Sequence, residues 1–411
     1  MAYLPKLNPT VGGGLGGLPE RKAGAGYEIG DIHGSEKVLA GEWLDTDGSI
    51  VSKEAYRDLA TVLPQVPSPQ KVADALSLPP STALSCSFSS SGTYLAIGHG
   101  ANPRISIYKR EGDVFTKLTD PITLPPSTGY SCDFSEDETY LAVGHASAPY
   151  ITIYKRSGDV FTKLANPASL PSSHVRSVSF SSSGTYLACG HQSSPYLTVY
   201  KRTGDVFTKV TAITGVPSTA SGVSFSSDDQ YLAVACAAAP FVLIYKRSGD
   251  TFTKLTNPAT LPTGAGKACD FSSSTNYLVI AHTNSPFMTI YKRSGDTFTK
   301  LANPATLPAT DGHGCFFSLN GEYLSIASSD TTAKIYARVG DTFTAIDNQP
   351  ENLTGTVNAT CFSNTGDYVV YAHAITPFFT VVKGAFSSTL LQLPNIPTAY
   401  LSPSVARIKA K

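Results

Sequence analysis

The residues most suggestive of chemistry are five histidines that recur at one spacing. Each lies five residues after a tyrosine, in a segment such as Tyr140–His145 (Y-L-A-V-G-H); the five are His99, His145, His191, His282 and His373. Imidazole binds metal ions and titrates near neutral pH. A regular set of histidines could therefore hold a metal ion or respond to pH.

Catalytic motifs are missing from the rest of the sequence. There is no G-x-S-x-G nucleophile elbow, no phosphate-binding P-loop and no H-E-x-x-H zinc motif. Asp45-Thr46-Asp47-Gly48 starts like a calcium loop but lacks the third acidic ligand and the closing Glu, so we interpret it as a turn. We expect no enzymatic activity and no cofactor.

The histidines belong to a repeat of 45 or 46 residues, whose register is set by Phe88, Phe134, Phe180, Phe225, Phe271, Phe317 and Phe362. Each copy has four short runs of β character, which read C-x-F-S or V-x-F-S, then Y-L-A-x-G-H, then I-x-I-Y-K, then F-T-K-L, with turn sequences between them. Seven copies of four strands predict an all-β fold, a seven-bladed β-propeller.

Five segments follow from this repeat and from local composition: a Gly-rich segment at 1–26, a small α+β module at 27–65, a linker or lead-in strand at 66–80, the propeller at 81–395 and a tail at 396–411. The outer strand of the last blade has two candidates, the segment ending at Leu78-Pro79 and the segment Ser388 to Leu393. We favour the C-terminal segment, with Lys71 to Leu78 as a lead-in along the first blade.

The repeat argues against a metal site at the histidines. Equivalent positions on the second strands of a seven-fold ring, ~4.7 Å outside the innermost strands, lie roughly 10 Å apart. Metal–nitrogen bonds are only ~2 Å long, so neighbouring histidines cannot share an ion without other ligands. We expect structural histidines that bond backbone between blades, with pH-sensitive packing as the alternative.

Composition limits the classes of partner. Lys plus Arg equals Asp plus Glu at 31 each, which favours neither nucleic acid nor a membrane surface as partner. No apolar run reaches the ~18 residues that span a bilayer, so we expect no membrane insertion. The N-terminus lacks the apolar core of a signal peptide, so we expect synthesis and folding in a cytoplasm.

Seven cysteines accompany the repeat: Cys86, Cys132, Cys189, Cys236, Cys269, Cys315 and Cys361. They recur at strand positions and show no pair spacing within a copy. We expect buried free thiols rather than disulfides.

The repeat resembles WD40-type propellers. The resemblance rests on the F-S-x-x-G-x-Y-L-A core, as in Phe180 to Ala188, and on the I-Y-K strand where that family has I-W-D, and it covers about three-quarters of the chain. The inter-blade G-H and the terminal W-D of the family are missing. The family's Asp-His-Ser/Thr-Trp network is therefore not expected here.

Recognition is expected on one face of the propeller. The second-to-third and fourth-to-first connections of such propellers share a face and vary most in this sequence. The candidates for stacking on a ligand are Tyr130, Tyr150, Tyr196, Phe241, Phe287 and Phe378, with plugging of gaps between blades as the alternative role. The K-R-S-G-D turns could form a phosphate-binding rim, but an Asp accompanies each cation, so we favour a solvated edge.

The stretch before the propeller resembles the collar-type module of bacteriophage tail proteins, which reads G-x-W-L-x-x-D-G-x-x-V-S-x-x-x-Y-x-x-L. The matching residues are Gly41, Trp43, Leu44, Asp47, Gly48, Val51, Ser52, Tyr56 and Leu59. Ser52 can cap a helix from Lys53 to Val62, on which Trp43 and Leu44 would pack. Trp43, Leu44, Tyr56 and Leu59 are the anchoring candidates.

This second resemblance implies a virion protein, such as a tail fibre, spike or decoration. Residues 1–65 would dock on other phage virion proteins, and the propeller would bind a host-surface glycan or protein. A homo-oligomer is implied as well, with three copies as in tail fibres. The alternative is an intracellular WD40-type protein-interaction scaffold with the N-terminal segment as a regulatory arm.

Overall fold

The computed structural model describes residues 69–211, 213–346, 353 and 355–384, together with the three short strands at 32–34, 43–45 and 406–409. The chain divides into two compact units. One comprises residues 67–388, and the other comprises residues 1–66 and 389–411.

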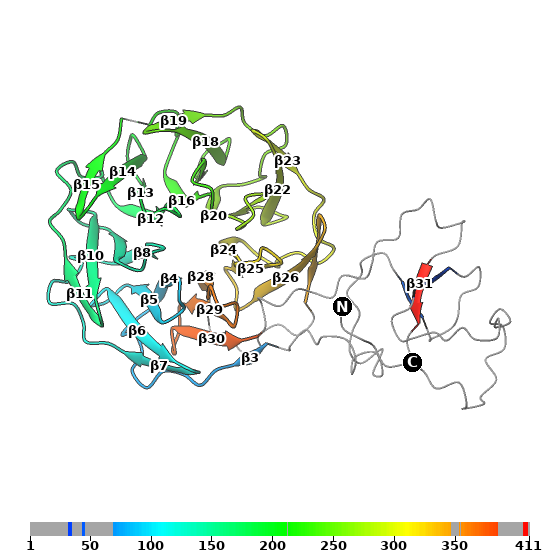
Figure 1. Cartoon of the computed structure of the whole chain (residues 1–411), viewed down its shortest axis with the longest axis horizontal. Helices are drawn as coiled ribbons and strands as arrows, with labels where there is room; N and C mark the ends of the chain where they lie inside the picture. The colour runs from blue at the N-terminus through cyan, green and yellow to red at the C-terminus, as the bar shows by residue number, and fades with distance from the viewer. Residues whose placement is uncertain are drawn as a thin grey trace. The chain divides into compact units, whose positions relative to one another are not determined.

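The larger unit is a ring of seven four-stranded antiparallel sheets (Figure 1). The inner strands, which surround the axis, have six residues each: β4 (Ala83–Phe88), β8 (Gly129–Phe134), β12 (Val175–Phe180), β16 (Ala220–Phe225), β20 (Gly266–Phe271), β24 (Gly312–Phe317) and β28 (Val357–Phe362). The second strands are β5 (Tyr94–His99), β9 (Tyr140–His145), β13 (Tyr186–His191), β17 (Tyr231–Cys236), β21 (Tyr277–His282), β25 (Tyr323–Ser328) and β29 (Tyr368–His373). The predicted seven-bladed β-propeller is confirmed.

The third and outer strands complete each blade. The third strands are β6 (Ile105–Glu111), β10 (Ile151–Ser157), β14 (Leu197–Thr203), β18 (Val242–Ser248), β22 (Met288–Ser294), β26 (Ala333–Val339) and β30 (Phe379–Lys383). The outer strands of blades one to six are β7 (Val114–Lys117), β11 (Val160–Lys163), β15 (Val206–Lys209), β19 (Thr251–Lys254), β23 (Thr297–Lys300) and β27 (Thr342–Ala345). Each is joined to its third strand by a tight turn.

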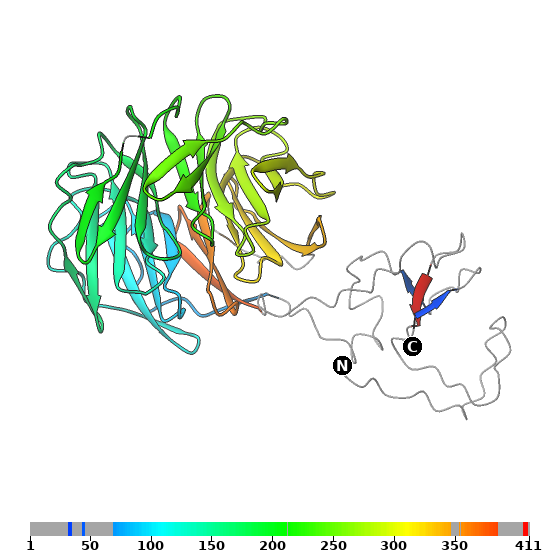
Figure 2. The ribbon, with the colours of Figure 1, turned by 45° about the horizontal axis from the view of Figure 1, so that its top comes forward.

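The outer strand of the seventh blade is β3 (Gln70–Lys71), which pairs with β30. The N–H of Val72 extends the pairing with a hydrogen bond to the Val381 carbonyl at 2.8 Å. Our preference for a C-terminal outer strand is therefore wrong, and the alternative from the start of the propeller is correct. Ser388 to Leu393 lies outside the described residues. Figure 1 shows the blue strand β3 beside the orange strand β30, and Figure 2 shows the same ring in a rotated view; the first strand of the propeller unit thus closes the ring.

The hydrophobic core lies between neighbouring blades. All six residues of every second strand are buried, because both faces of that strand are covered by adjacent sheets. One cluster, for example, joins Tyr94 and Ile107 of the first blade to Phe134, Leu141 and Phe161 of the second. This double coverage explains why the second run is mostly apolar and does not alternate between apolar and polar residues.

The seven cysteines are free thiols, as predicted; Cys86 is half-buried and the other six are buried. Burial raises the pKa of the Cys236 thiol to about 11. These thiols therefore act as small apolar side chains.

The smaller unit contains a three-stranded antiparallel sheet in the order β1 (Ile32–Gly34), β31 (Ala406–Lys409), β2 (Trp43–Asp45). The C-terminal strand thus lies between two N-terminal strands, which the division into an N-terminal module and a separate tail did not anticipate. The helix expected at Lys53 to Val62 lies outside the described residues. Within the described part of the chain, no helix has the length and apolar character to cross a membrane.

Candidate ligand-binding face and the contacts between blades

The five histidines close their second strands, as predicted, and all are fully buried. Each Nε2 lies 3.0–3.1 Å from a Ser or Thr hydroxyl seven residues later, on the third strand of the same blade. The partner is therefore a side chain of the same blade, and not the backbone of a neighbouring blade as we expected. In His191 and His373, Nδ1 lies 2.8–2.9 Å from a backbone carbonyl two residues on.

These contacts indicate neutral, structural imidazoles. Burial lowers the pKa of His99, His145 and His191 to about 4 and that of His282 below its usual value. Across the described residues, no group of three or more His, Cys, Asp or Glu side chains is placed to hold a metal ion.

The second-to-third connections present most of the aromatic candidates. Tyr150, Tyr196, Phe241, Phe287 and Phe378 each follow a cis-proline and adopt a left-handed φ of 66–69°. In each loop the aromatic N–H donates to the carbonyl three residues earlier, which closes a turn. All five side chains are half-buried, and Arg104 takes their place in the first blade.

Two candidates meet residues of the third blade. The guanidinium carbon of Arg176 lies 4.2 Å from the ring centroid of Tyr130, and the Tyr150 ring lies 6.3 Å from that of His174. With its amide oxygen facing Arg176, Gln192 accepts from Arg176 Nε at 3.0 Å and from Nη2, and its amide nitrogen donates to His174 Nδ1 at 2.9 Å. Tyr130 and Tyr150 thus border one polar cluster, in which His174, Arg176 and Gln192 are linked by hydrogen bonds.

The other candidates are not brought together with this cluster. Tyr196 packs against the core between the third and fourth blades, and Phe378 packs against the core that closes the ring. Tyr150 also packs against a core cluster. Each of these three rings is therefore partly used to fill the gap between two blades. Trp43 and Leu44 lie in β2. Tyr56 and Leu59 lie outside the described residues.

The opposite, turn-bearing face holds the blades together through a repeated contact, which we call the clasp. It joins a Tyr and a Lys of one blade to an Asp and an Arg in the hairpin of the next. At the second-to-third blade boundary, the Tyr140 hydroxyl donates to Asp205 Oδ1 at 2.6 Å, and Lys155 Nζ lies 2.8 Å from Asp205 Oδ2. The Arg202 guanidinium carbon lies 4.8 Å from the Tyr140 ring centroid.

Six boundaries carry the clasp, with the Tyr–Asp pairs Tyr94–Asp159, Tyr140–Asp205, Tyr186–Asp250, Tyr231–Asp296, Tyr277–Asp341 and Tyr368–Asp113. The seventh blade takes its outer strand from β3, so it has no hairpin to offer the sixth blade. Hydrogen bonds from Lys155 and Tyr140 hold the pKa of Asp205 below its usual range. The lysines of the rim are therefore paired with aspartates, as the solvated-edge interpretation requires, but these pairs join different blades.

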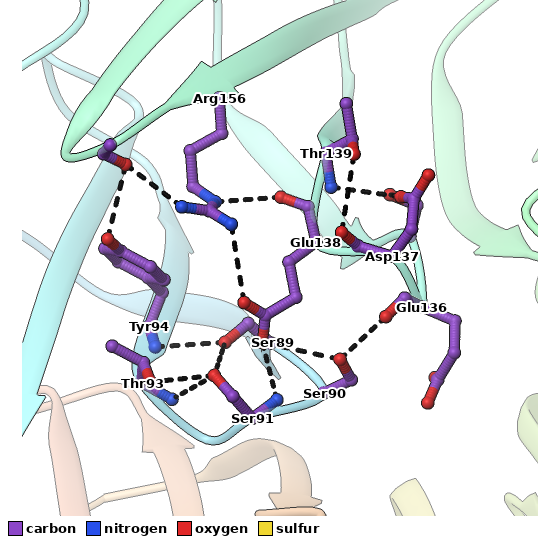
Figure 3. Close-up of polar contacts among 12 residues, drawn as sticks. Ser89, Ser90, Ser91, Thr93, Tyr94, Glu136, Asp137, Glu138, Thr139 and Arg156 are labelled. Atoms are coloured by element: carbon purple, nitrogen blue, oxygen red, sulfur yellow. Dashed lines mark hydrogen bonds and ion pairs between the residues drawn. The ribbon is translucent and has the colours of Figure 1, made fainter.

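Figure 3 shows the corresponding region at the boundary between the first and second blades. Arg156 Nε donates to the Glu138 carbonyl at 2.8 Å, and Nη2 lies 3.4 Å from Glu138 Oε2. The Glu138 carboxylate accepts from the Ser91 N–H and from the Ser90 hydroxyl, across the blade boundary. The Tyr94 hydroxyl donates to the Gly158 carbonyl at 3.2 Å. The turns on this face are thus committed to contacts between blades.

Two acids on the inner strands were missed by sequence reasoning. Asp133 Oδ2 accepts from the Phe180 N–H of the next blade at 2.7 Å, and Asp270 Oδ2 accepts from the Phe317 N–H at 2.8 Å. Burial raises the pKa of each carboxyl to about 7. The available signal was the change from C-S-F to C-D-F in the second and fifth copies.

The blade geometry defines the class of the protein, a WD40-like seven-bladed β-propeller. A family profile described as "WD domain, G-beta repeat" matches residues 167–194, which cover the first two strands of the third blade. Among solved structures, the chain is similar to "Kuenenia stuttgartiensis Hydrazine Synthase", with 13% identity, coverage of 76% of this chain and 97% of that chain, and a TM-score of 0.60. Identity this low shows the fold alone. No curated protein matches the chain.

Proposed function

We propose that this chain is a structural protein of a bacteriophage particle, a tail fibre, spike or decoration that displays its propeller for binding to a host-surface glycan. The observation that carries the proposal is the collar-like motif from Gly41 to Leu59, placed directly before the propeller. Nine motif positions match within about twenty residues, and a short motif with a fixed Trp, Asp-Gly turn and Tyr is rarely met by chance.

The division of the chain supports separate anchoring and binding roles. Strands from both chain ends, β1, β2 and β31, share one sheet in the smaller unit, while residues 67–388 form the propeller. A unit made from both termini can serve docking, while a separate unit, the propeller, serves ligand binding. We propose that residues 1–65 dock on other virion proteins and that the protein is a homo-trimer, as in tail fibres.

The loop face supports ligand binding rather than turnover as the propeller's role. Half-buried aromatic rings are held there in closed turns, and a rigid aromatic surface suits stacking on sugars at low entropic cost. We propose that the propeller binds its ligand without converting it.

The virion assignment is tested by asking where the chain resides. Particles purified from a culture that produces the protein are labelled with gold-conjugated antibodies against the propeller and imaged. We expect label on the particle in three-fold copy number. Recovery of all of the protein in the particle-free host fraction would overturn the assignment.

Glycan binding is tested separately, with the purified full chain labelled fluorescently and incubated with host cells. We expect adhesion that purified host polysaccharide competes away. Adhesion that protease treatment of the cells abolishes, and polysaccharide does not affect, would assign a protein receptor instead.

The match to a WD repeat favours a second candidate, an intracellular protein-interaction scaffold with residues 1–66 as a regulatory arm. This candidate predicts stable complexes with cytosolic proteins in the particle-free fraction. Gold labelling on particles would exclude it as the main role.

A further inference from the structure

One set of side chains around the propeller axis is not explained by packing. In every blade, the residue four positions before the register Phe is skipped in the pairing of the inner and second strands. Such an extra residue is a β-bulge, which re-aims its side chain. We call these seven residues the bulge ring: Leu84, Tyr130, Arg176, Ser221, Lys267, His313 and Asn358.

The bulge ring is where the repeats differ within an otherwise uniform element. The register Phe and the Tyr six residues later are the same in all seven copies, whereas the bulge position carries seven different residue types. The bulge itself is present in all seven blades, so the backbone feature is common and only the side chain changes. A position that served packing would be expected to keep its residue type, as the Phe and Tyr positions do.

Neighbouring members of the ring interact across blade boundaries. Arg176 lies over the Tyr130 ring. Asn358 Nδ2 donates to the carbonyl of Ala83, next to Leu84, at 2.8 Å. The pKa of His313 is lowered by burial and by the charge of Lys267, while Asp311 and a hydrogen bond with Asn358 oppose this shift. These contacts link Tyr130 to Arg176, and His313 to Lys267 and Asn358, across the blade boundaries.

The ring shares a face with the aromatic loops. The inner strand starts where the second strand ends, since Gly129 pairs with His145 and Gly312 with Ser328. The bulge residues follow directly after these starts. The bulge ring and the second-to-third connections, including the turn that ends at Tyr150, thus lie at the same end of the blades.

The ring has the chemistry of a site for acidic ligands. Arg176 and Lys267 carry positive charges, and Lys267 is exposed while the other six members are half-buried. Gln192 accepts from Nε and Nη2 of Arg176, and no acceptor lies on Nη1 among the residues that the structure describes. That edge of a preoriented guanidinium is available to a carboxylate.

The uncharged members favour a sugar as carrier of the acid. Ser221 lies between Arg176 and Lys267 in ring order, so a hydroxyl separates the two cations, and the imidazole of His313 and the amide of Asn358 follow Lys267. Tyr130, held by Arg176, adds an aromatic surface. Hydroxyl-bonding groups next to cations and an aromatic ring suit an oligosaccharide that bears carboxylates better than an acidic peptide.

We propose that the bulge ring binds an acidic oligosaccharide, with Arg176 and Lys267 contacting its carboxylates and Tyr130 contacting a sugar ring. The choice of a glycan rests on the proposed host-surface role of the propeller. The ring itself is assigned from the bulges, their contacts and their charges.

The test is titration calorimetry of the full chain with an oligogalacturonate, and with the fully methyl-esterified form of the same oligomer, which keeps the hydroxyls and loses the charge. We expect binding of the acid form and at least about tenfold weaker binding of the ester, because charge-assisted hydrogen bonds are lost. Arg176→Gln and Lys267→Gln should each weaken binding of the acid form by about tenfold.

The matched control is Lys254→Gln, since Lys254 is exposed on an outer strand and bonds Asn257 of its own blade. Unchanged affinity in this variant, with weaker binding in Lys267→Gln, supports the ring. Lys267 is exposed, so its variant remains informative if Arg176→Gln fails to fold.

Three results would overturn the proposal: no binding of the acid form, equal binding of the methyl ester, or tighter binding of poly-glutamate than of oligogalacturonate. Failure of this proposal can be distinguished from failure of the proposed host-binding function. Host adhesion that Arg176→Gln and Lys267→Gln leave unchanged would remove the ring and keep the adhesin. Oligogalacturonate binding by a chain that does not adhere to host cells would keep the ring and remove the adhesin.

Discussion

The two inner-strand acids should make the propeller less stable as the pH rises. Asp133 has a pKa of about 7 in the native state against an ordinary value of 3.8, because burial disfavours its charge. The native state therefore holds more protons than the unfolded chain between these values, and the free energy of unfolding falls across that window. Each pH unit costs 1.36 kcal/mol at most, so Asp133 removes up to about 3 kcal/mol between pH 5 and pH 7.

Asp133→Asn tests this expectation, because the amide keeps an oxygen for the Phe180 N–H and cannot ionise. Residue 133 keeps some exposure to solvent, which reduces the effect below its upper limit, so we expect about 1–2 kcal/mol of stabilisation at pH 8 relative to the effect at pH 5. Urea denaturation at both pH values measures it. Asp270→Asn should behave alike.

The matched control is Ser179→Ala, which removes an acceptor for the Phe225 N–H at the equivalent position of the third blade. It should destabilise the protein by about 1 kcal/mol, equally at both pH values, since the hydroxyl does not titrate. If the curves of Asp133→Asn and the unmodified protein stay parallel from pH 5 to pH 8, the carboxyl is ionised in the native state and the reasoning is refuted.

Three further predictions concern the assembly of the ring. Tyr140→Phe removes one clasp hydroxyl and should cost about 1 kcal/mol in urea denaturation, while Lys254→Ala, outside the clasps, should leave stability unchanged. Gly144→Ala should lower the melting temperature, because a Cβ there would lie 2.5 Å from Val175 Cγ1; Val175→Ala removes that atom but leaves its Cβ and carbonyl at 3.1 Å, so it should restore part of the loss, and no rescue would place the strain elsewhere. Val72→Pro deletes the N–H that bonds Val381 and should destabilise by about 3 kcal/mol; an unchanged melting temperature would show that this outer strand does not close the ring.

The blades could be predicted because each copy repeats the same packing problem. The spacing of the register Phe and Tyr residues gives the length of the repeat, and the mostly apolar second strand indicates burial on both of its faces. The closing strand could not be predicted in the same way. Only Gln70 and Lys71 form its ladder, which is too short for any alternation, so the sequence carried no pattern that could correct our preference for Ser388 to Leu393 over the segment ending at Leu78-Pro79.

The contacts between blades were beyond sequence reasoning for a different reason. The clasp partners Tyr140 and Asp205 are 65 residues apart, which is more than one repeat, so the pairing appears only when neighbouring blades are set side by side. Within one copy, each Asp could be related only to the cations of its own turn. The bulges were hidden as well, because Tyr130 and Arg176 follow the same β-type pattern as residues that pair regularly.

The clasps that stabilise the ring lie on one face of the blades, and the ligand site that we propose lies on the other. On the turn face, the Tyr, Asp, Lys and Arg residues form the clasps. These residues hardly vary between blades, because each one contacts a residue of the neighbouring blade. At the other face the bulge leaves one residue per blade outside the ladder, so its side chain can change without altering a strand pair. A ring built this way can acquire seven different ligand contacts on an unchanged scaffold. Substitutions at Tyr130, Arg176 or Lys267 should therefore alter binding far more than the free energy of unfolding, and clasp substitutions should do the reverse.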